Sequence, residues 1–353
     1  MQDASVAVIG AGVVGLTTAI ALLRRGARVT VIADRIEDPP ASWTSPAAFT
    51  PYPGPLAERL ERWTVEAFDA FERLARDHPE SGVEMGPLRE LLHRPHRLEP
   101  WAMRLMAARP AAAFPPFVQV LDTTRPLIDM VRYLPWLRDR VLAAGGRLAC
   151  RRVERLDASC RRGFDAVVLC AGTGSATLAA DPMVRPMHGQ VVHVPNDIDL
   201  DHSVHDDGID GSTTYVFRFR DRLVLGGTFQ EGRTAVGTDP ASVQDILRRA
   251  RELLRLDGHP RWSELGSTVM LARGAARPAR GRGDVFEDLR LELDPDLSPG
   301  RLVHHYGHGR QGVTLSWATA AEAARLTLAD GRPPRIRDAA GGSGPCPAPP
   351  PRS

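Results

Sequence analysis

The segment from residue 5 to residue 34 constrains the fold more than any other part of the chain. The run Val6–Ile9 is β-branched and apolar, which predicts a short buried strand of a parallel sheet. The apolar stretch Val13–Arg25 predicts a helix, and Arg28–Ala33 predicts a second strand. A strand, a helix and a strand within about thirty residues are typical of a unit that binds a dinucleotide.

Three glycines, Gly10, Gly12 and Gly15, connect the first strand to the helix with the spacing G-x-G-x-x-G. The first glycine allows a tight turn, the second lets the backbone approach a pyrophosphate, and the third lets the helix pack on the strand. The pyrophosphate then lies at the positive end of the helix dipole. Asp34, nineteen residues after Gly15, follows the second strand and can accept hydrogen bonds from an adenosine ribose. NAD and FAD share this unit, so the unit alone does not identify the dinucleotide.

The composition excludes several classes of function. At 353 residues the chain is long enough for two domains, and its apolar fraction of 43% is ordinary for a globular protein. The 45 basic and 43 acidic residues nearly balance, which gives no electrostatic case for nucleic-acid binding. All basic residues are arginine, and the absence of lysine excludes Schiff-base chemistry, pyridoxal phosphate included. No stretch is long and apolar enough to cross a membrane.

The cysteines indicate the compartment. Cys150, Cys160, Cys170 and Cys346 show neither a metal-binding spacing nor a C-x-x-C motif. We therefore expect no metal site, and reduced thiols in a cytoplasmic protein. The first strand begins at about residue 5, which leaves no room for a cleavable signal sequence.

The middle of the chain continues the first domain after an interruption. Residues 38–46 are rich in Pro, Ser and Thr and predict a loop, where the hydroxyls of Thr44 and Ser45 either face a cofactor or satisfy the loop backbone. Amphipathic patterns predict helices over 56–76 and 129–144. Further strands are expected at 147–156 and 164–174, and together with helix 129–144 they rejoin the first sheet. Residues 79–118 are the least informative.

From residue 188 apolar and polar residues alternate, which predicts antiparallel strands. These expected strands are 190–194, 215–219, 222–227, 266–271 and 289–293, with one helix over 241–256. A last strand at 302–306, a glycine loop at 307–312 and a helix over 313–329 close the chain.

The fold class expected is α/β combined with α+β, with a discontinuous Rossmann-type dinucleotide domain and an inserted, mostly antiparallel substrate domain. The first domain would comprise residues 1–51, 129–186 and 300–330, and the second residues 52–128 and 187–299. The Pro, Gly and Arg content of residues 331–353 predicts a disordered tail.

Several separated segments resemble FAD-dependent D-amino acid oxidases, within the wider group of flavoproteins that oxidise amines and amino acids. The segments are Val6–Gly15 with Ala33–Arg35, Asp165–Gly172, Leu225–Gln230, Ala276–Arg280 and His304–Leu315. The last is close to the family signature His-Asn-Tyr-Gly-His-Gly-Gly-x-Gly-Leu-Thr. The resemblance extends over most of residues 5–328 and is weakest in 55–125. It implies FAD as the cofactor, bound without a covalent link.

The resemblance implies a role for each matching residue on the cofactor side. The glycines of the first turn would hold the pyrophosphate, Asp34 the adenosine ribose, and Val153 would lie against the adenine by its backbone. The loop 307–314 would lie along the flavin, with the helix N-terminus facing the electron-rich end of the ring. The full set of expected cofactor contacts is Gly10, Gly12, Gly15, Asp34, Arg35, Thr44, Ser45, Val153, Gly172, Gly307, Gly309, Gly312, Val313 and Thr314.

On the substrate side the resemblance implies that Arg277 pairs bidentately with the substrate carboxylate and that Tyr215 adds a phenolic hydrogen bond. A guanidinium fork matches a planar carboxylate in two parallel bonds, and Arg280 is the next candidate for this role. His308 is interpreted as a structural residue of the loop rather than as a base.

Three departures from the family pattern fall in the substrate half. Where the family has a second active-site Tyr, the candidates here are Asp210 and Gly211. Arg310 stands where the family has a small residue, beside the carbonyl that receives the substrate amine, and Thr50 replaces a Gln near the flavin. Arg310 either turns into the pocket, where its cation would act on the substrate, or points to solvent.

The function expected is oxidative deamination of a D-amino acid. Hydride would pass from Cα to flavin N5, giving an imino acid that hydrolyses to a 2-oxo acid and ammonia, while O2 becomes hydrogen peroxide. Two alternatives stay open: a specialised biosynthetic amine or amino-acid oxidase or dehydrogenase acting on a modified substrate, and a degenerate flavin-binding protein. The partners expected are the amino acid and O2, with neither nucleic acid nor membrane. The sequence allows a homodimer and does not fix the oligomeric state.

Overall fold

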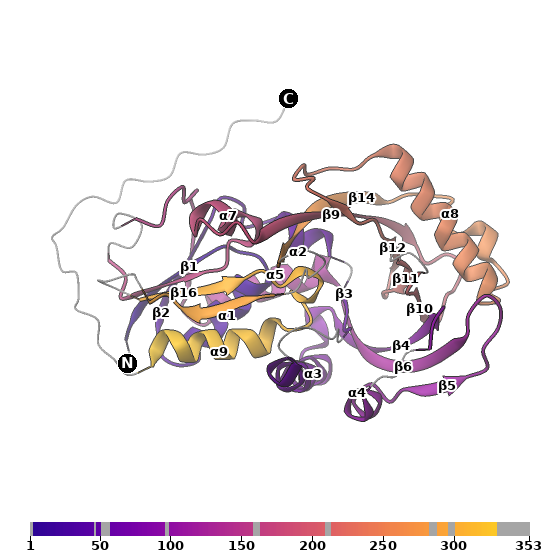
Figure 1. Ribbon diagram of the computed structural model, residues 1–353, viewed down its shortest axis with the longest axis horizontal. Coiled ribbons are helices and arrows are strands. Elements are labelled where there is room, and N and C mark those ends of the chain that lie inside the picture. Colours follow the sequence, from indigo (N-terminus) through magenta and orange to yellow (C-terminus); the bar gives the residue numbers. More distant parts are fainter. Residues whose placement is uncertain are drawn as a thin grey trace.

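In the computed structural model two β-sheets lie side by side along the long axis of the molecule (Figure 1). The structure describes residues 3–45, 47–50, 57–95, 99–157, 163–208, 213–281, 288–295 and 301–329. The expected tail, and the two residues Asp210 and Gly211, lie outside the described residues.

The first sheet has six strands in the order β15-β16-β8-β1-β2-β7. All neighbours are parallel except the edge strand β15, which is antiparallel to β16. The strands are β1 (Ser5–Ile9), β2 (Arg28–Ala33), β7 (Arg147–Cys150), β8 (Ala166–Leu169), β15 (Arg290–Leu293) and β16 (Arg301–Tyr306). Because helices and loops cover both faces, the central strands consist almost entirely of buried apolar residues.

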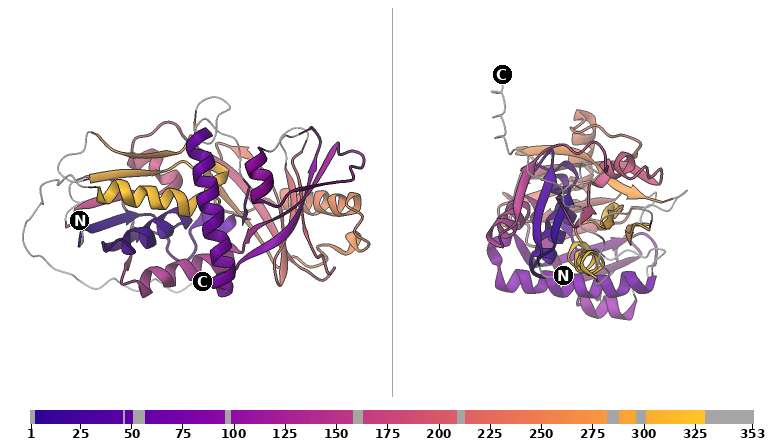
Figure 2. Two further views of the ribbon diagram at one scale, coloured as in Figure 1. Left: turned by 90° about the horizontal axis from the view of Figure 1, so that it is seen from below. Right: turned by 90° about the vertical axis from the view of Figure 1, so that its left-hand side faces the viewer.

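Helices pack on this sheet and around its junction with the second one. Helices α1 (Val13–Leu23), α5 (Met130–Ala143) and α9 (Ser316–Leu328) share one core with one face of β1, β2 and β8. The short α7 (Ser175–Leu178) packs on the opposite face. The long amphipathic α3 (Ala57–Asp77) contacts α9 of the first half and β4 and β6 of the second (Figure 2). Helix α3 therefore packs against both halves of the molecule.

The second sheet has ten strands, eight of them in the order β13-β9-β12-β11-β10-β4-β6-β3, with β14 paired to β9 and β5 to β6. The strands are β3 (Ala47–Ala48), β4 (Val83–Leu92), β5 (Arg109–Ala111), β6 (Gln119–Ile128), β9 (Val184–Pro195), β10 (Ser203–Asp206), β11 (Thr214–Arg218), β12 (Arg222–Gly226), β13 (Gln230–Glu231) and β14 (Leu271–Arg280). Helix α8 (Pro240–Leu256) covers one face of this sheet, and α4 (Pro100–Leu105) lies beside β6. The other face looks toward the first sheet.

Five expectations about elements need correction. Residues 266–270 form no strand, because β14 begins at Leu271 and continues to Arg280. The strand expected at 289–293 is β15, which joins the first sheet rather than the substrate domain, because it pairs with β16. The expected loop 38–46 contains the short helix α2 (Pro40–Thr44), and the strand expected at 147–156 ends at Cys150. Conversely β3, expected in the first domain, pairs with β6 in the second sheet.

Among the described residues no helix combines the length and the apolar character that a membrane crossing requires.

Candidate active site

A cavity of about 1310 Å³ lies where the carboxyl ends of the parallel strands face the second sheet. Pockets for ligands of drug size span roughly 300–1,000 Å³, so this cavity has room for a dinucleotide and a further small molecule. Residues that follow β1, β2, β8 and β16 line it on one side, and residues of β10, β11 and β14 line it on the other. Ligands of open α/β sheets bind at this edge of the strands.

The glycine turn after β1 lines the cavity between the residues that follow β8 and those that follow β2. Gly10 has φ +113°, and a Cβ atom there would lie 2.3 Å from the carbonyl oxygen of Cys170. Gly12 lines the cavity, and among the described residues beyond its immediate neighbours only Ser42 Oγ, at 3.0 Å, lies near its would-be Cβ. Gly15 does not line the cavity; its would-be Cβ lies 1.9 Å from the Gly10 carbonyl oxygen, so it allows the helix to pack on the turn. Gly10 and Gly15 thus have the turn and packing tasks that the spacing predicts, and Gly12 lies at the cavity, where the spacing predicts the approach to a pyrophosphate.

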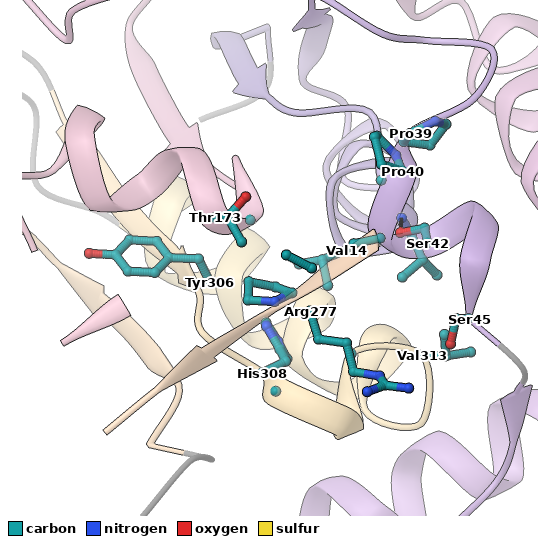
Figure 3. A pocket seen from close by; sticks show the side chains of 18 of the residues that line it. Val14, Pro39, Pro40, Ser42, Ser45, Thr173, Arg277, Tyr306, His308 and Val313 are labelled. Atoms are coloured by element: carbon teal, nitrogen blue, oxygen red, sulfur yellow. Dashed lines mark hydrogen bonds between the residues drawn. The ribbon is translucent and has the colours of Figure 1, made fainter. Parts of the chain in front are cut away.

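Ser42 is a cavity residue that the sequence analysis missed. Its Oγ accepts a hydrogen bond of 3.0 Å from the backbone N–H of Val13, the first residue of α1. Ser45 also lines the cavity, as expected, whereas Thr44 is buried and does not line it. The missed signal is the pair Pro39-Pro40, because proline is favoured at the first position of a helix, and α2 turns Ser42 toward α1 (Figure 3).

Residues that follow β2 and β7 line the cavity on one side of the glycine turn. Asp34, Arg35 and Val153 all line it, together with Arg152 and Glu154. The Arg35 guanidinium donates to Asp38 from Nε at 3.1 Å, and this hydrogen bond raises the pKa of Arg35. The acidic residue expected to contact a ribose therefore lies in the same part of the cavity as the residue expected beside an adenine.

The loop after β16 lines the cavity on the other side of the glycine turn from β2 and β7. Gly307, Gly309, Arg310, Gly312, Val313 and Thr314 line it, and Gly172, with φ +58° after β8, lies on the same side. Gly309–Gln311 forms a 3-10 turn that precedes helix α9. The cavity thus meets the N-terminal end of α9 as well as that of α1.

His308 in this loop is buried and neutral. Burial lowers its pKa to about 4, and its Nε2 lies 3.4 Å from the Thr319 hydroxyl. The neighbouring His305 is fully buried as well, with its Nδ1 at 3.0 Å from Thr18 Oγ1, and burial again lowers its pKa. These contacts agree with the interpretation of His308 as a structural residue of the loop.

Arg277 reaches the cavity from β14, on the side opposite the glycine turn. Its Nη1 donates to the carbonyl oxygen of Thr228 at 3.3 Å. Its guanidinium lies directly over Gly189 of β9, where a Cβ atom would be 2.3–2.4 Å from Nη1, Nη2 and Cζ. Only glycine at position 189 leaves room for this guanidinium, and no sequence motif indicated that requirement. In Figure 3 the Arg277 guanidinium extends toward Val313 and Ser45.

Tyr215 lines the same part of the cavity from β11. Its ring stacks on Phe217, with ring centroids 4.5 Å apart and an interplanar angle of 13°. The phenol lies over Gly226 of β12, where a Cβ atom would be 2.0 Å from the tyrosine oxygen. A glycine beneath each polar group therefore makes space for both Arg277 and Tyr215.

His205 is a second cavity residue that the sequence analysis missed. It is the cross-strand partner of Tyr215, so both side chains lie on the same face of the sheet. Its Nδ1 is 3.8 Å from Oε1 of buried Glu90, which is paired with the buried Arg125 at 2.9 Å. Burial lowers the pKa of His205 although the carboxylate of Glu90 opposes the shift. The cavity wall beside Tyr215 therefore carries a neutral imidazole.

The remaining substrate-side expectations fall into three groups. Arg280 does not line the cavity, because its guanidinium is paired with Asp181 and Asp288, and so it is no alternative carboxylate anchor. Arg310 lines the cavity and is exposed to solvent at its rim. Thr50 also lines the cavity and donates to the carbonyl oxygen of Ala48 at 3.3 Å.

Helix α8 and the loop after β12 complete the mouth of the cavity, a contribution that the sequence did not indicate. Asp245 on α8 accepts from Arg248 at 2.7 Å and from Arg249 at 2.8 Å, and Arg249 also donates to the carbonyl oxygens of Thr213 and Gly227. The apolar side chains of Phe229 and Val236 are exposed at this mouth, 45% and 59% respectively. Arginines and apolar side chains thus lie side by side at this part of the cavity wall.

Comparison with known proteins identifies proteins similar to this chain. The family model described as FAD dependent oxidoreductase matches residues 5–326. The D-amino-acid oxidase of Rubrobacter xylanophilus is 37% identical over 323 residues, which cover 90% of this chain and 94% of the relative. The D-amino-acid oxidase of Streptomyces coelicolor is 37% identical over 328 residues, 92% of this chain and 97% of the relative.

A solved structure supports the fold. The crystal structure of glycine oxidase from Bacillus cereus superposes with a TM-score of 0.71 at 17% identity, covering 95% of this chain and 100% of that one. The matches confirm the fold class and the resemblance expected from the sequence.

Proposed function

Because the chain belongs to the family of FAD-dependent oxidoreductases, we propose that it oxidises the α-carbon of a D-amino acid. The amino acid, O2 and water give a 2-oxo acid, ammonia and hydrogen peroxide. The D configuration is the one in the names of the relatives that are 37% identical.

The residues of the cavity fit FAD. Gly12 keeps open the space that a pyrophosphate needs, since a side chain there would enter the cavity beside Ser42. The first turn of α1 and the turn before α9 both open on the cavity, and helix N-termini bind anionic groups. Asp34 and Val153 lie at the end that the adenosine would occupy. When bound, FAD supplies the two-electron acceptor for the hydride that leaves Cα.

The arrangement of Arg277 and Tyr215 is the observation that carries the substrate proposal. Both line the cavity from the second sheet, opposite the glycine-rich edge of the first sheet. The guanidinium fork of Arg277 binds the substrate carboxylate in two parallel hydrogen bonds, and Tyr215 donates a third from its phenol. Holding the carboxylate fixes Cα relative to the cofactor, and such positioning supplies most of the catalysis. The neutral imidazole of His205 adds no charge beside the carboxylate.

We propose that the FAD is held without a covalent link. Cys170 is buried at the end of β8, where burial raises the pKa of its thiol to about 12, so it is a poor nucleophile. Precipitation of the protein with acid should release all yellow colour into the supernatant. Flavin that stays with the precipitate contradicts this part of the proposal.

We also propose a cytoplasmic location, which is supported by the free thiols of Cys150 and Cys170.

The experiment that tests the function is an anaerobic titration of the yellow protein with D- and L-amino acids and secondary amines. D-amino acids should bleach the flavin absorbance, and air should restore it rapidly with release of hydrogen peroxide. Bleaching by L-amino acids or secondary amines alone would contradict the proposed substrate. Slow reoxidation in air would indicate a dehydrogenase, and a flavin that no compound bleaches would indicate a degenerate protein.

A further inference from the structure

The two sheets meet at the ends of β14 and β16. Strand β14 carries Arg277 and ends at Arg280, and β16 ends at Tyr306, immediately before Gly307 of the cavity loop. An antiparallel bridge joins Ala279 to His308 at this point. The proposed carboxylate anchor, Arg277, therefore lies only two residues from Ala279, where its strand contacts the loop expected along the flavin.

A cluster of buried and partly buried polar side chains holds this junction, and we name its members, Asp181, Arg280, Arg290 and Tyr306, the junction cluster. Asp181 Oδ2 accepts from Arg280 Nε at 2.8 Å and from the Tyr306 hydroxyl at 2.9 Å. The same hydroxyl accepts from Arg290 Nη1 at 3.0 Å. The side chain of Asp181 is only 4% exposed. Four segments distant in sequence are therefore joined through one carboxylate and one phenol.

The electrostatics keep this carboxylate ionised. Burial alone would raise the pKa of Asp181, but hydrogen bonds from Arg280, from the backbone N–H of Met183 and from Tyr306 lower it. The phenol stays neutral, since burial raises the pKa of Tyr306 to about 12. A charge that is buried and fully hydrogen-bonded resists displacement, because moving any partner leaves the charge uncompensated.

One member of the cluster, Arg280, also lies directly against the cavity loop. Gly307 has φ +85°, and a Cβ atom there would lie 2.7 Å from Cβ and 2.9 Å from Cδ of Arg280. The Tyr306 ring lines the cavity, but its hydroxyl points away from Arg277 and His308, toward Asp181 (Figure 3). Neither the carboxylate of Asp181 nor the hydroxyl of Tyr306 is therefore placed to contact a substrate.

We propose that the junction cluster sets the distance between Arg277 and the loop 307–314, and so the distance between the substrate Cα and the cofactor. This inference rests on the proposed function. The members of the junction cluster are positioning residues, because they act through the strand that carries Arg277 and through the loop that follows β16. A displacement of about 1 Å at a reacting centre lowers the rate by about a hundredfold. Loss of one hydrogen bond in the cluster should therefore slow the chemical step while substrate still binds.

The test compares Tyr306→Phe and Asp181→Asn with the wild-type protein, using Tyr133→Phe as the matched control. Tyr133 is also fully buried, and its oxygen accepts one hydrogen bond, from Trp317 Nε1 at 2.7 Å, without lining the cavity. Each FAD-saturated protein is mixed anaerobically with the D-amino acid that reduces the wild type fastest. The rate constant of reduction, the apparent Kd of that amino acid, the Kd of FAD and the thermal midpoint are measured.

Tyr306→Phe should lower the rate constant of reduction at least about tenfold, while the apparent Kd for the amino acid changes less than about threefold. Asp181→Asn should have a larger effect in the same direction. Tyr133→Phe should lower the thermal midpoint and leave the rate constant unchanged. The inference is overturned if both cluster variants reduce within about twofold of the wild type, since the cluster would then contribute only to stability.

A second readout does not need turnover. Benzoate is a carboxylate without an α-hydrogen, and its binding to Arg277 should change the flavin absorbance spectrum. Tyr306→Phe should alter this benzoate-induced difference in the flavin spectrum, whereas Tyr133→Phe should leave it as in the wild type. If no D-amino acid reduces the wild type, the proposed function fails and the benzoate spectra still decide the inference. Identical benzoate spectra in wild type and Tyr306→Phe, or no benzoate response in the wild type, would overturn it.

Discussion

At the scale of single residues, Arg277 owes its place in the cavity to a glycine on the neighbouring strand. Its guanidinium occupies the space in which a side chain at position 189 would lie. Arg277 and Tyr215 were predicted because they match motifs of a family, and the structure brings both to one cavity. Gly189, Ser42 and His205 were not predicted, because the partners that give them a role come from strands or helices distant in sequence.

Removal of the Arg277 guanidinium should lower kcat/KM for the best D-amino acid by several powers of ten. The change removes the bidentate charged pair with the substrate carboxylate, and it also removes the orientation of Cα. Both losses lower kcat/KM. Arg277→Lys should recover little, because an ammonium is a point charge and not a planar fork. The control is Arg255→Ala, since Arg255 pairs with Glu252 on the exposed surface of α8. Normal turnover by Arg277→Ala would place the carboxylate anchor elsewhere.

Gly189→Ala should weaken substrate binding without loss of FAD. The added methyl group would overlap the Arg277 guanidinium, which must move away from the position described here. We expect KM to rise by about tenfold or more, equivalent to about 1.4 kcal/mol of lost interaction. The measurement is steady-state kinetics together with the ratio of flavin to protein. An unchanged KM would show that Arg277 can bind a carboxylate in another position.

At the scale of elements, the first N–H of helix α1 donates its hydrogen bond to a side chain of another helix. The hydroxyl of Ser42 on α2 does for Val13 what a capping side chain does from within its own segment. The glycine spacing predicted where α1 starts, but the partner of its first N–H could not be predicted. Only the fold brings residue 42 to residue 13.

Ser42→Ala should therefore weaken both the helix end and the FAD site. Loss of a capping hydroxyl costs about 1 kcal/mol in the free energy of unfolding. The Kd of FAD should rise, and urea unfolding and fluorescence titration with FAD measure the two effects. Ser267→Ala is the control, because that hydroxyl donates to Glu264 O in an exposed turn.

Gly12→Val, by contrast, should abolish FAD binding, since the valine side chain would fill the space of the pyrophosphate. FAD retained by this variant would contradict the proposed position of the pyrophosphate beside Gly12.

Strand β14 shows why some elements escaped prediction. Its sequence, Leu-Ala-Arg-Gly-Ala-Ala-Arg-Pro-Ala-Arg, contains no β-branched or aromatic residue and has little intrinsic preference for a strand. It is extended because it pairs with β9 along its whole length, from Leu271 opposite His193 to Arg280 opposite Val184. Strands β1, β2 and β8 of the first sheet were predicted well because their β-branched runs are largely buried. The assignment of β15 was wrong because alternation predicts a strand and not its sheet.

At the scale of the whole molecule, buried histidines couple the fold to pH. Burial lowers the pKa of His193 and of His308 to about 4, and that of His305 well below its usual value. In the unfolded chain the histidine pKa is about 6.5. Above that pH both states are uncharged at these sites, so protonation does not change the free energy of unfolding. Below it the unfolded state binds protons that the folded state excludes, and stability is lost as the pH falls from about 6.5 to about 4.

We therefore expect the thermal midpoint, at saturating FAD, to fall between pH 7 and pH 5. His193→Gln should reduce the size of that fall, because it removes one titrating group. His202 has the opposite sign: its hydrogen bond with Asp257 raises its pKa, so its contribution is lost only as the pH rises through that raised value. A midpoint that is equal at pH 7 and pH 5, in wild type and variant alike, would contradict the coupling.

The two-sheet architecture also places the residues proposed to bind the cofactor and those proposed to bind the substrate in different sheets. The glycine turn and the loop 307–314 belong to the first sheet and its connections, whereas Arg277, Tyr215 and His205 lie on strands of the second. A substitution on β10 or β11 can therefore change which side chain the cavity accepts while the nucleotide-binding edge stays as it is. New substrate ranges are accessible in this chain through variation of one sheet, with the yellow colour of the purified protein reporting at every step that the other is intact.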